Sequence, residues 1–139
     1  MIERGANIDA KDNVDDTALH RAAFFGFTEV AVALIERGAN VHARDKSNYT
    51  PLHLAASSSD KPEMAVALIE RGADLHARDV LDRTPLHLAA ERAQPAVAVA
   101  LIERGADVHA KGERNSTPLH SAAFTGHSQV AEALIERGA

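Results

Sequence analysis

Histidine is the side chain of this sequence best suited to metal or proton chemistry, and eight histidines are present. Four of them end the string T-A-L-H or T-P-L-H, namely His20, His53, His87 and His120. Each string has the form of a helix start, with threonine as the cap and, where present, proline in the first turn. An imidazole repeated at this place favours hydrogen bonds to backbone groups at the turn and between neighbouring segments. We predict a structural role for these four histidines.

Three further histidines, His42, His76 and His109, share a second column of the sequence, which holds Asp9 upstream. If the segments that carry them stack as helical units, these side chains lie roughly 8–10 Å apart. Zinc requires nitrogen ligands at about 2.0–2.1 Å from one shared ion, so this spacing is too coarse for a zinc site. We therefore predict no metal and no cofactor.

Enzymatic signatures are missing from the sequence. It contains no G-x-x-x-x-G-K-[ST], H-E-x-x-H or G-x-S-x-G string, and without cysteine it has no thiol nucleophile. Its one pair of adjacent carboxylates, Asp15 and Asp16, falls at a predicted turn, where solvated aspartate is common. We predict no catalytic residue and no small-molecule substrate. A targeting arm of a larger enzyme or secreted effector, and a purely structural role, remain alternatives.

Composition disfavours several other classes of function. A length of 139 residues with 45% hydrophobic residues suits one domain with a continuous core. The formal net charge of −5 argues against binding to nucleic acid, which usually requires a concentrated basic face. The longest aliphatic stretch, 96–102, is much shorter than the roughly 20 residues of a membrane-spanning helix. Without cysteines or a secretion-signal pattern, we expect a cytoplasmic location by default and leave open secretion into a host cell.

An internal repeat organises the whole chain. The string E-R-G-A starts at Glu3, Glu36, Glu70, Glu103 and Glu136, and subtraction gives steps of 33, 34, 33 and 33 residues. The T-[AP]-L-H strings start at Thr17, Thr50, Thr84 and Thr117, with steps of 33, 34 and 33 residues. Both ladders lengthen by one residue in the same unit, which places an insertion within 57–61. The chain is therefore a tandem array of similar units.

Each unit is predicted to hold two helices. The first begins at T-[AP]-L-H and contains paired alanines such as Ala55 and Ala56, whose small size lets neighbouring helices approach. The second begins at a column of threonine, serine or proline and carries an apolar face that we expect to be buried. That face recurs as Val30, Leu34 and Ile35, as Met64, Leu68 and Ile69, as Val97, Leu101 and Ile102, and as Val130, Leu134 and Ile135.

A tight turn is expected two residues before each threonine of the T-[AP]-L-H strings. The residue there is always Asp or Asn, the non-glycine types that best tolerate positive φ. These turn residues are Asp15, Asn48, Asp82 and Asn115.

A period of 33 residues with T-P-L-H-x-A opening the first helix resembles the ankyrin repeat. The resemblance divides the chain into the tail of an upstream repeat (1–11), three repeats (12–44, 45–78 with the insertion, and 79–111) and a fourth repeat that lacks its final turn (112–139). It implies an all-α solenoid of stacked antiparallel helix pairs with turn or hairpin fingers. Local departures from the pattern include Gly112, in a column of aspartates, and Ala93, in a column that holds Gly26 and Gly126.

The resemblance further implies a non-catalytic module that binds a partner protein or peptide on its concave face. In the family, binding residues lie at the turn tips and on the exposed face and end of the first helix. These columns vary between the units of this chain while the others barely change, which indicates that packing does not constrain them. Carried over column by column, the predicted partner-binding residues are Asn13, Val14, Asp16, Arg21, Phe24, Phe25, Lys46, Ser47, Tyr49, Ser57, Ser58, Val80, Leu81, Arg83, Glu91, Arg92, Glu113, Arg114, Ser116, Phe124 and Thr125, with Leu54, Leu88 and Ser121 in the same columns.

Aromatic residues are concentrated in these columns. Four of the five aromatic side chains belong to the predicted surface: Phe24, Phe25, Tyr49 and Phe124. Because aromatic and arginine side chains dominate the energy of many interfaces, we expect accessible anchors on the concave side. The expected anchors are Tyr49, Phe24, Arg83 or Arg92. The alternative for the phenylalanines is that they cover the loop between the two helices as peripheral core.

Two features bear on self-association. Val32, Val66 and Val99 lie about 200° around the second helix from its predicted buried face, so we expect them to point to solvent. The outermost units keep the apolar pattern of the inner ones, which indicates a fragment of a longer array. A complete small protein with frayed ends is the alternative. We expect a monomer, and association through these valines or through the uncapped ends is the competing hypothesis.

Overall fold

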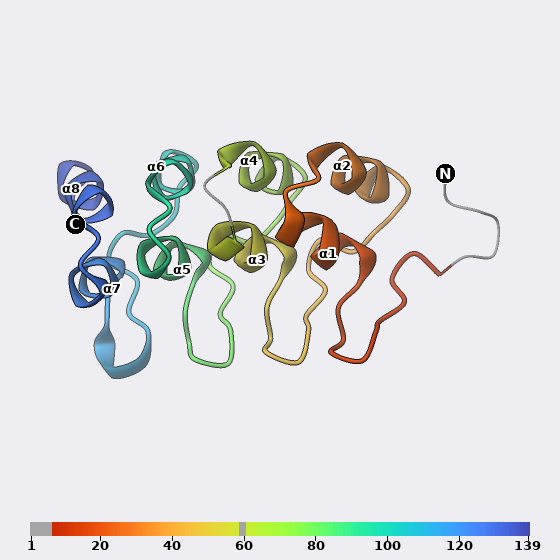
Figure 1. Cartoon of the computed structure of the whole chain (residues 1–139), viewed down its shortest axis with the longest axis horizontal. Helices are drawn as coiled ribbons and strands as arrows, with labels where there is room; N and C mark the ends of the chain where they lie inside the picture. The colour runs from red at the N-terminus through yellow and green to blue at the C-terminus, as the bar shows by residue number, and fades with distance from the viewer. Residues whose placement is uncertain (1–6, 59–60) are drawn as a thin grey trace.

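The computed structural model describes residues 7–58 and 61–139, and this part of the chain contains helices and no β-strand. The α-helices form four consecutive pairs (Figure 1). Their bounds are α1 (Ala18–Phe25), α2 (Thr28–Glu36), α3 (Pro51–Ser58), α4 (Pro62–Glu70), α5 (Pro85–Glu91), α6 (Pro95–Glu103), α7 (Pro118–Thr125) and α8 (Ser128–Glu136), and a 3-10 helix, η1, spans Glu113–Asn115. The predicted all-α class is confirmed. Residues 1–6 of the predicted upstream tail, and residues 59–60 of the predicted insertion, lie outside the described residues.

The helices lie in two layers. The first helices of the pairs, α1, α3, α5 and α7, form one layer, and the second helices form the other (Figure 1). Neighbouring first helices contact each other more extensively than neighbouring second helices do. Their interfaces contain the predicted alanines, of which Ala56, Ala89 and Ala90 are 0% exposed. Long turns project from the first-helix layer as fingers, and we call the surface of fingers and first helices the finger face. In the predicted solenoid this is the concave side.

The apolar faces of the second helices form much of the core. Met64, Val97 and Val130 are 0–1% exposed, as expected for this column. Val30 occupies the same column but is 52% exposed, so its predicted burial is wrong. This column is buried even in α8, the last second helix, so it faces the second helix of the preceding unit. Val30 lies in α2, and no helix is described before α1 that could cover it. Ile135 of α8 is 58% exposed for the converse reason, since its column faces the following unit.

The predicted turns are confirmed. Asp15, Asn48, Asp82 and Asn115 all have φ between 60° and 63°, in the left-handed region that Asp and Asn tolerate. Ala93 has φ of 56° between α5 and α6, where α1 and α7 end in glycines with φ of 74° and 78°. The chain follows the same path with alanine there, although a Cβ disfavours this conformation.

The outward valines are less exposed than expected. Val32, Val66 and Val99 are half-buried, whereas Glu132 in the same column of α8 is exposed. A second helix packs on its own first helix and on neighbouring second helices, so only a narrow outer strip is left to solvent. In the described part of the chain, no helix is long and apolar enough to cross a membrane.

Candidate partner-binding surface

All four repeated histidines bond the threonine at their own helix start, and the first three also connect it to the next finger. In the first unit the N–H of His20 donates to Oγ1 of Thr17, and the N–H of Thr17 donates to Nδ1 of His20 at 3.1 Å. Nδ1 is therefore an acceptor, so Nε2 carries the hydrogen and donates to the carbonyl of Tyr49 at 2.8 Å. In the next two units the corresponding bonds run from His53 to the Arg83 carbonyl at 3.0 Å and from His87 to the Ser116 carbonyl at 2.8 Å. The predicted structural role is confirmed.

Burial holds the middle histidines in their neutral form. Desolvation lowers the pKa of both His53 and His87, and the carbonyl acceptors of Arg83 and Ser116 oppose this effect only in part. A neutral imidazole with one donor and one acceptor fits the bonds described above. His120, in the last unit, keeps the Thr117 cap but is exposed.

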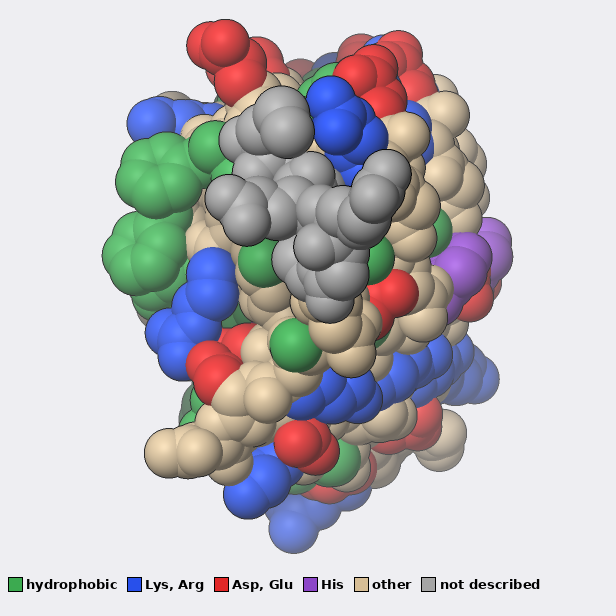
Figure 2. All heavy atoms as spheres, turned by 90° about the vertical axis from the view of Figure 1, so that its right-hand side faces the viewer, with side chains coloured by type: hydrophobic (Ala, Val, Ile, Leu, Met, Phe, Trp, Pro, Cys, Tyr) green, Lys and Arg blue, Asp and Glu red, His purple; other side chains and the backbone are tan. Residues whose placement is uncertain are grey.

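A second ladder of bonds runs between fingers, and sequence reasoning missed it. Lys11 donates from Nζ to the Arg44 carbonyl at 3.0 Å, Arg44 donates from Nη1 to the Arg78 carbonyl at 2.7 Å, and Arg78 donates to the Lys111 carbonyl. Figure 2, which looks along the stack from its N-terminal end, shows Lys and Arg side chains receding in a row. The available signal was that these four basic residues recur at the repeat period. The ladder fixes the spacing of the fingers.

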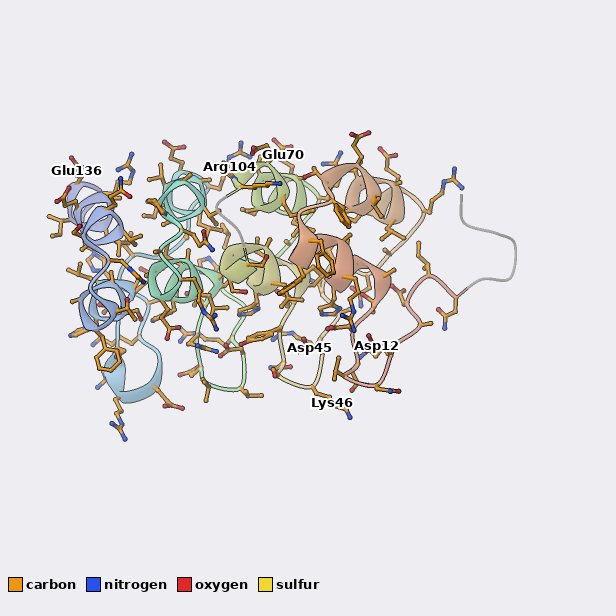
Figure 3. The ribbon with its side chains drawn as sticks, viewed as in Figure 1. Asp12, Asp45, Lys46, Glu70, Arg104 and Glu136 are labelled. Atoms are coloured by element: carbon orange, nitrogen blue, oxygen red, sulfur yellow. The ribbon has the colours of Figure 1, made fainter. Side chains whose placement is uncertain are left out.

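Aspartates build the first three fingers. Oδ1 of Asp12, Asp45 and Asp79 accepts two backbone N–H groups in each case, from residues two and four positions later. Figure 3 places Asp12 and Asp45 at the bases of neighbouring fingers, with Lys46 further toward the tip. A hydrogen bond from Arg21, followed by one from the Val14 N–H, lowers the pKa of Asp12 to about 2.

The fourth finger is built differently, because Gly112 offers no carboxylate. A Cβ at Gly112 would lie 2.8 Å from the Asp82 carbonyl oxygen, so glycine is required for this close approach. The finger instead forms η1, in which Arg114 has φ of 56°. The departure noted in the sequence therefore changes the shape of one finger and leaves the stacking intact.

Most of the predicted partner-binding residues are exposed. The exposed ones are Asn13, Val14, Arg21, Phe24, Phe25, Lys46, Ser47, Val80, Leu81, Arg92, Glu113, Arg114, Phe124 and Thr125. The partly buried ones are Asp16, Tyr49, Ser57, Ser58, Arg83, Glu91 and Ser116. Among the expected anchors, Phe24 and Arg92 are accessible, whereas Tyr49 and Arg83 are not free.

Arg83 is tied into a polar cluster, contrary to its expected accessibility. Its side chain is only 18% exposed and donates to Asp79 Oδ2 and to Glu91 Oε2, each at 2.9 Å. Its Nη2 also donates to the hydroxyl of Tyr49 at 3.1 Å. The sequence separations of 34 and 8 residues to Tyr49 and Glu91 explain why local reasoning did not reveal these contacts.

The phenylalanines of the first unit stack on one another at the surface. Phe24 and Phe25 meet edge to face at 5.0 Å between ring centroids, and Phe25 and Phe27 stack at 5.7 Å. Each of the three is still 45–57% exposed. They therefore form an exposed aromatic cluster, and a covered peripheral core does not describe them.

One cluster of potential metal ligands occurs in the described part of the chain. Ligand atoms of Asp16, His20 and Asp45 lie within 4.8 Å of one another. Both ring nitrogens of His20 already bond protein groups, as described above, so neither has a free lone pair for a cation. Oδ1 of Asp16 is buried without a hydrogen-bond partner, and burial, followed by the neighbouring Asp45, raises the pKa of Asp16. The cluster is better explained as an unfavourable carboxylate contact than as a metal site.

A groove of about 240 Å³ opens on the finger face between the third and fourth units. Its lining includes Leu81, Arg83, Glu91, Ser116, Ser121 and Phe124. Ser116 stands in the column of Tyr49 and Arg83, and Ser121 stands in the column of Leu54 and Leu88. Two small side chains thus replace large ones where the groove lies. Seven predicted partner-binding residues line it: Leu81, Arg83, Glu91, Glu113, Arg114, Ser116 and Phe124.

Comparison with known families decides the classification. The family model described as ankyrin repeats (3 copies) matches residues 1–79 and 62–139, which together span the chain. The chain belongs to the ankyrin repeat family. No match was found among the curated proteins. Ankyrin repeats are generally non-catalytic modules that bind other proteins, so the exposed finger face of this ankyrin array is its candidate functional surface.

Proposed function

We propose that this ankyrin array is a non-catalytic module that binds a partner protein or peptide on its finger face. The observation that carries the proposal is the placement of the variable columns. Most of their side chains are exposed on the fingers and first helices, whereas in the first three units the invariant Thr, Leu and His of the T-[AP]-L-H strings are buried and each of these histidines bonds the next finger. A surface that varies on a scaffold that does not vary is suited to recognition.

The exposed apolar side chains of this surface support the proposal. Phe24 and Phe25 are 45% and 54% exposed, Val80 is 62% exposed and Phe124 is 93% exposed. Large aromatic side chains of this kind supply most of the binding energy in many interfaces. Burying them against a partner would stabilise the complex by about 25 cal/mol per Å² of apolar surface, before the costs of association.

The rigidity of the fingers also supports binding. Two sets of bonds, across 29–34 residues, hold neighbouring fingers together. One set comes from His20, His53 and His87, and the other comes from Lys11 and Arg44. A surface that is already ordered loses little conformational entropy when a partner binds.

Quantitative affinity purification tests the proposal. The full chain is immobilised and compared with a Phe24→Glu, Phe124→Glu double variant, which charges two ends of the finger face. A control variant, Arg37→Glu, changes an exposed residue beside the second-helix layer. We expect proteins that bind the parent chain and the control to be lost from the double variant. Equal recovery by all three chains would show that the finger face is not the binding surface.

A further inference from the structure

The groove between the third and fourth units lies where two serines replace the larger side chains of the preceding units. In the second and third units, Leu54 and Leu88 occupy the column of Ser121 and are 9% and 0% exposed. The row that contains Ser116 holds Tyr49 and Arg83 in those units, and these two side chains touch, with the Tyr49 hydroxyl 3.1 Å from Nη2 of Arg83. The row breaks after Arg83, because serine is too short to continue it. The groove lies at this break.

Arg83 is held rigidly on the wall of the groove. Asp79, Glu91 and Tyr49 fix its guanidinium through the bonds described above. A planar guanidinium that cannot turn away offers a fixed surface on which an aromatic ring can stack.

The remaining walls favour an uncharged occupant. Leu81 is 45% exposed and Phe124 is 93% exposed, so both present apolar surface. The charges along the groove cancel, since Arg83 and Arg114 are balanced by Glu91 and Glu113. A charged side chain would find no excess of opposite charge there, whereas a ring would contact Phe124, Leu81 and the guanidinium of Arg83.

From these features we infer that the groove receives a large aromatic side chain of the partner, tyrosine or phenylalanine, as the anchor of the complex. The inference rests on the proposed function and adds the position and the chemistry of the main contact. Tyr49 contacts Arg83 from the side of the second unit. The incoming ring contacts Arg83 from the side of the fourth unit and thereby continues the row that ends at Ser116.

A peptide selection tests this inference. Short random peptides displayed on phage are selected on the intact chain, and the affinity of synthetic versions is measured by fluorescence anisotropy. We expect the selected peptides to share an aromatic residue whose replacement by alanine weakens binding by about tenfold or more. Peptides that bind the chain without any aromatic residue would overturn the inference.

Two variants locate the contact. Ser121→Leu fills the groove with the residue found in the same column of the second and third units, and we expect at least about tenfold weaker binding. Ser128→Leu makes the same change at the exposed start of α8 and should leave the affinity unchanged. If Ser121→Leu does not fold by circular dichroism, Ser116→Tyr fills the groove from the other column and takes its place.

The outcomes separate this inference from the proposed function. Peptides that bind the groove-filled variant as tightly as the parent chain overturn the inference and leave the module a peptide binder. Failure to select any peptide on the intact chain overturns the inference, while the affinity purification decides the proposed function separately.

Discussion

The first helices of the third and fourth ankyrin repeats open with the same string, T-P-L-H, yet equivalent side chains in the two repeats have different roles. In the third, His87 is buried and bonds the next finger, Asp79 holds its own finger, and Arg83 is locked between two carboxylates. In the fourth, His120 is exposed, and the columns of Asp79 and Arg83 hold Gly112 and Ser116.

The difference shows how one repeat pattern serves both packing and recognition. Large polar residues between two units form hydrogen bonds and ion pairs with each other, so they stabilise the stack and expose little surface to a partner. Small residues at the same columns leave a groove, which remains available to a partner. Phe24 and Phe124 also share a column and differ in exposure. Phe24 is 45% exposed because the Phe25 ring covers part of it, whereas Phe124 is 93% exposed.

The largest effect should come from removing a buried histidine. His53→Ala should lower the free energy of unfolding by about 3 kcal/mol, because it leaves a cavity, a Thr50 N–H without its acceptor and an unpaired Arg83 carbonyl. His120→Ala removes the same acceptor, here for the Thr117 N–H, at an exposed position without a described bond to a further unit, and should cost about 1 kcal/mol. Urea denaturation measures both. Equal losses would contradict the contrast between middle and last units.

The next effect concerns the finger aspartates. Asp79→Ala should cost about 2 kcal/mol, because removal of this fully buried carboxylate leaves two backbone donors and Nε of Arg83 without their acceptor. Asp12→Ala removes the equivalent group from an exposed finger and should cost well under half as much. Thermal and urea unfolding of the two variants, side by side, would show whether burial sets the difference.

Stability should depend on pH through the middle histidines. Burial lowers the pKa of His53 and His87, so the unfolded chain binds protons more readily than the folded one. Their contribution is complete above the ordinary histidine pKa of 6.5 and is lost as the pH falls from there toward the lowered values. Urea titrations between about pH 7.5 and about pH 5.5 should show this slope. The slope should be shallower in His53→Gln, and an unchanged slope would assign the effect elsewhere.

A glycine exchange should stabilise the third repeat. Ala93→Gly should raise the free energy of unfolding by about 0.5 kcal/mol, because it relieves a positive φ that glycine adopts without strain. The reverse change, Gly126→Ala, should lower it, since an added Cβ meets no atom within 4 Å and only the backbone conformation, with φ of 78°, opposes it. In thermal denaturation we expect the melting temperature to rise for Ala93→Gly and to fall for Gly126→Ala. A change in the same direction for both variants would exclude backbone strain as the cause.

The smallest effect distinguishes Asp12 from Asp16, two of the acidic residues of the first finger. Asp16→Asn should stabilise the chain by a few tenths of a kcal/mol near neutral pH, because burial and Asp45 disfavour the ionised form of Asp16 and raise its pKa. Asp12→Asn should destabilise it above pH 3.8, since Arg21 and the Val14 N–H favour its ionised form. The gain from Asp16→Asn should disappear as the pH falls and Asp16 becomes protonated. A gain that persists in acid would point to packing.

Sequence alone was sufficient for the units, their helices and their turns. The signals for these features act within a few residues: a threonine cap and its histidine three positions later, aspartate or asparagine where φ is positive, and apolar residues at helical spacing. The sequence also predicted which variable columns lie on the fingers and on the first helices. These local determinants repeat, so each unit supported the interpretation of the others.

Only the tertiary structure decided which of those columns are free. Whether Arg83 is an anchor or an internal partner depends on Tyr49 and Glu91, and whether Val30 is buried depends on the presence of a preceding helix. The groove arises where Ser116 and Ser121 meet residues of another unit. These outcomes depend on side chains that stacking brings together across about one repeat length, and no pattern within a single unit specifies what lies on its neighbour.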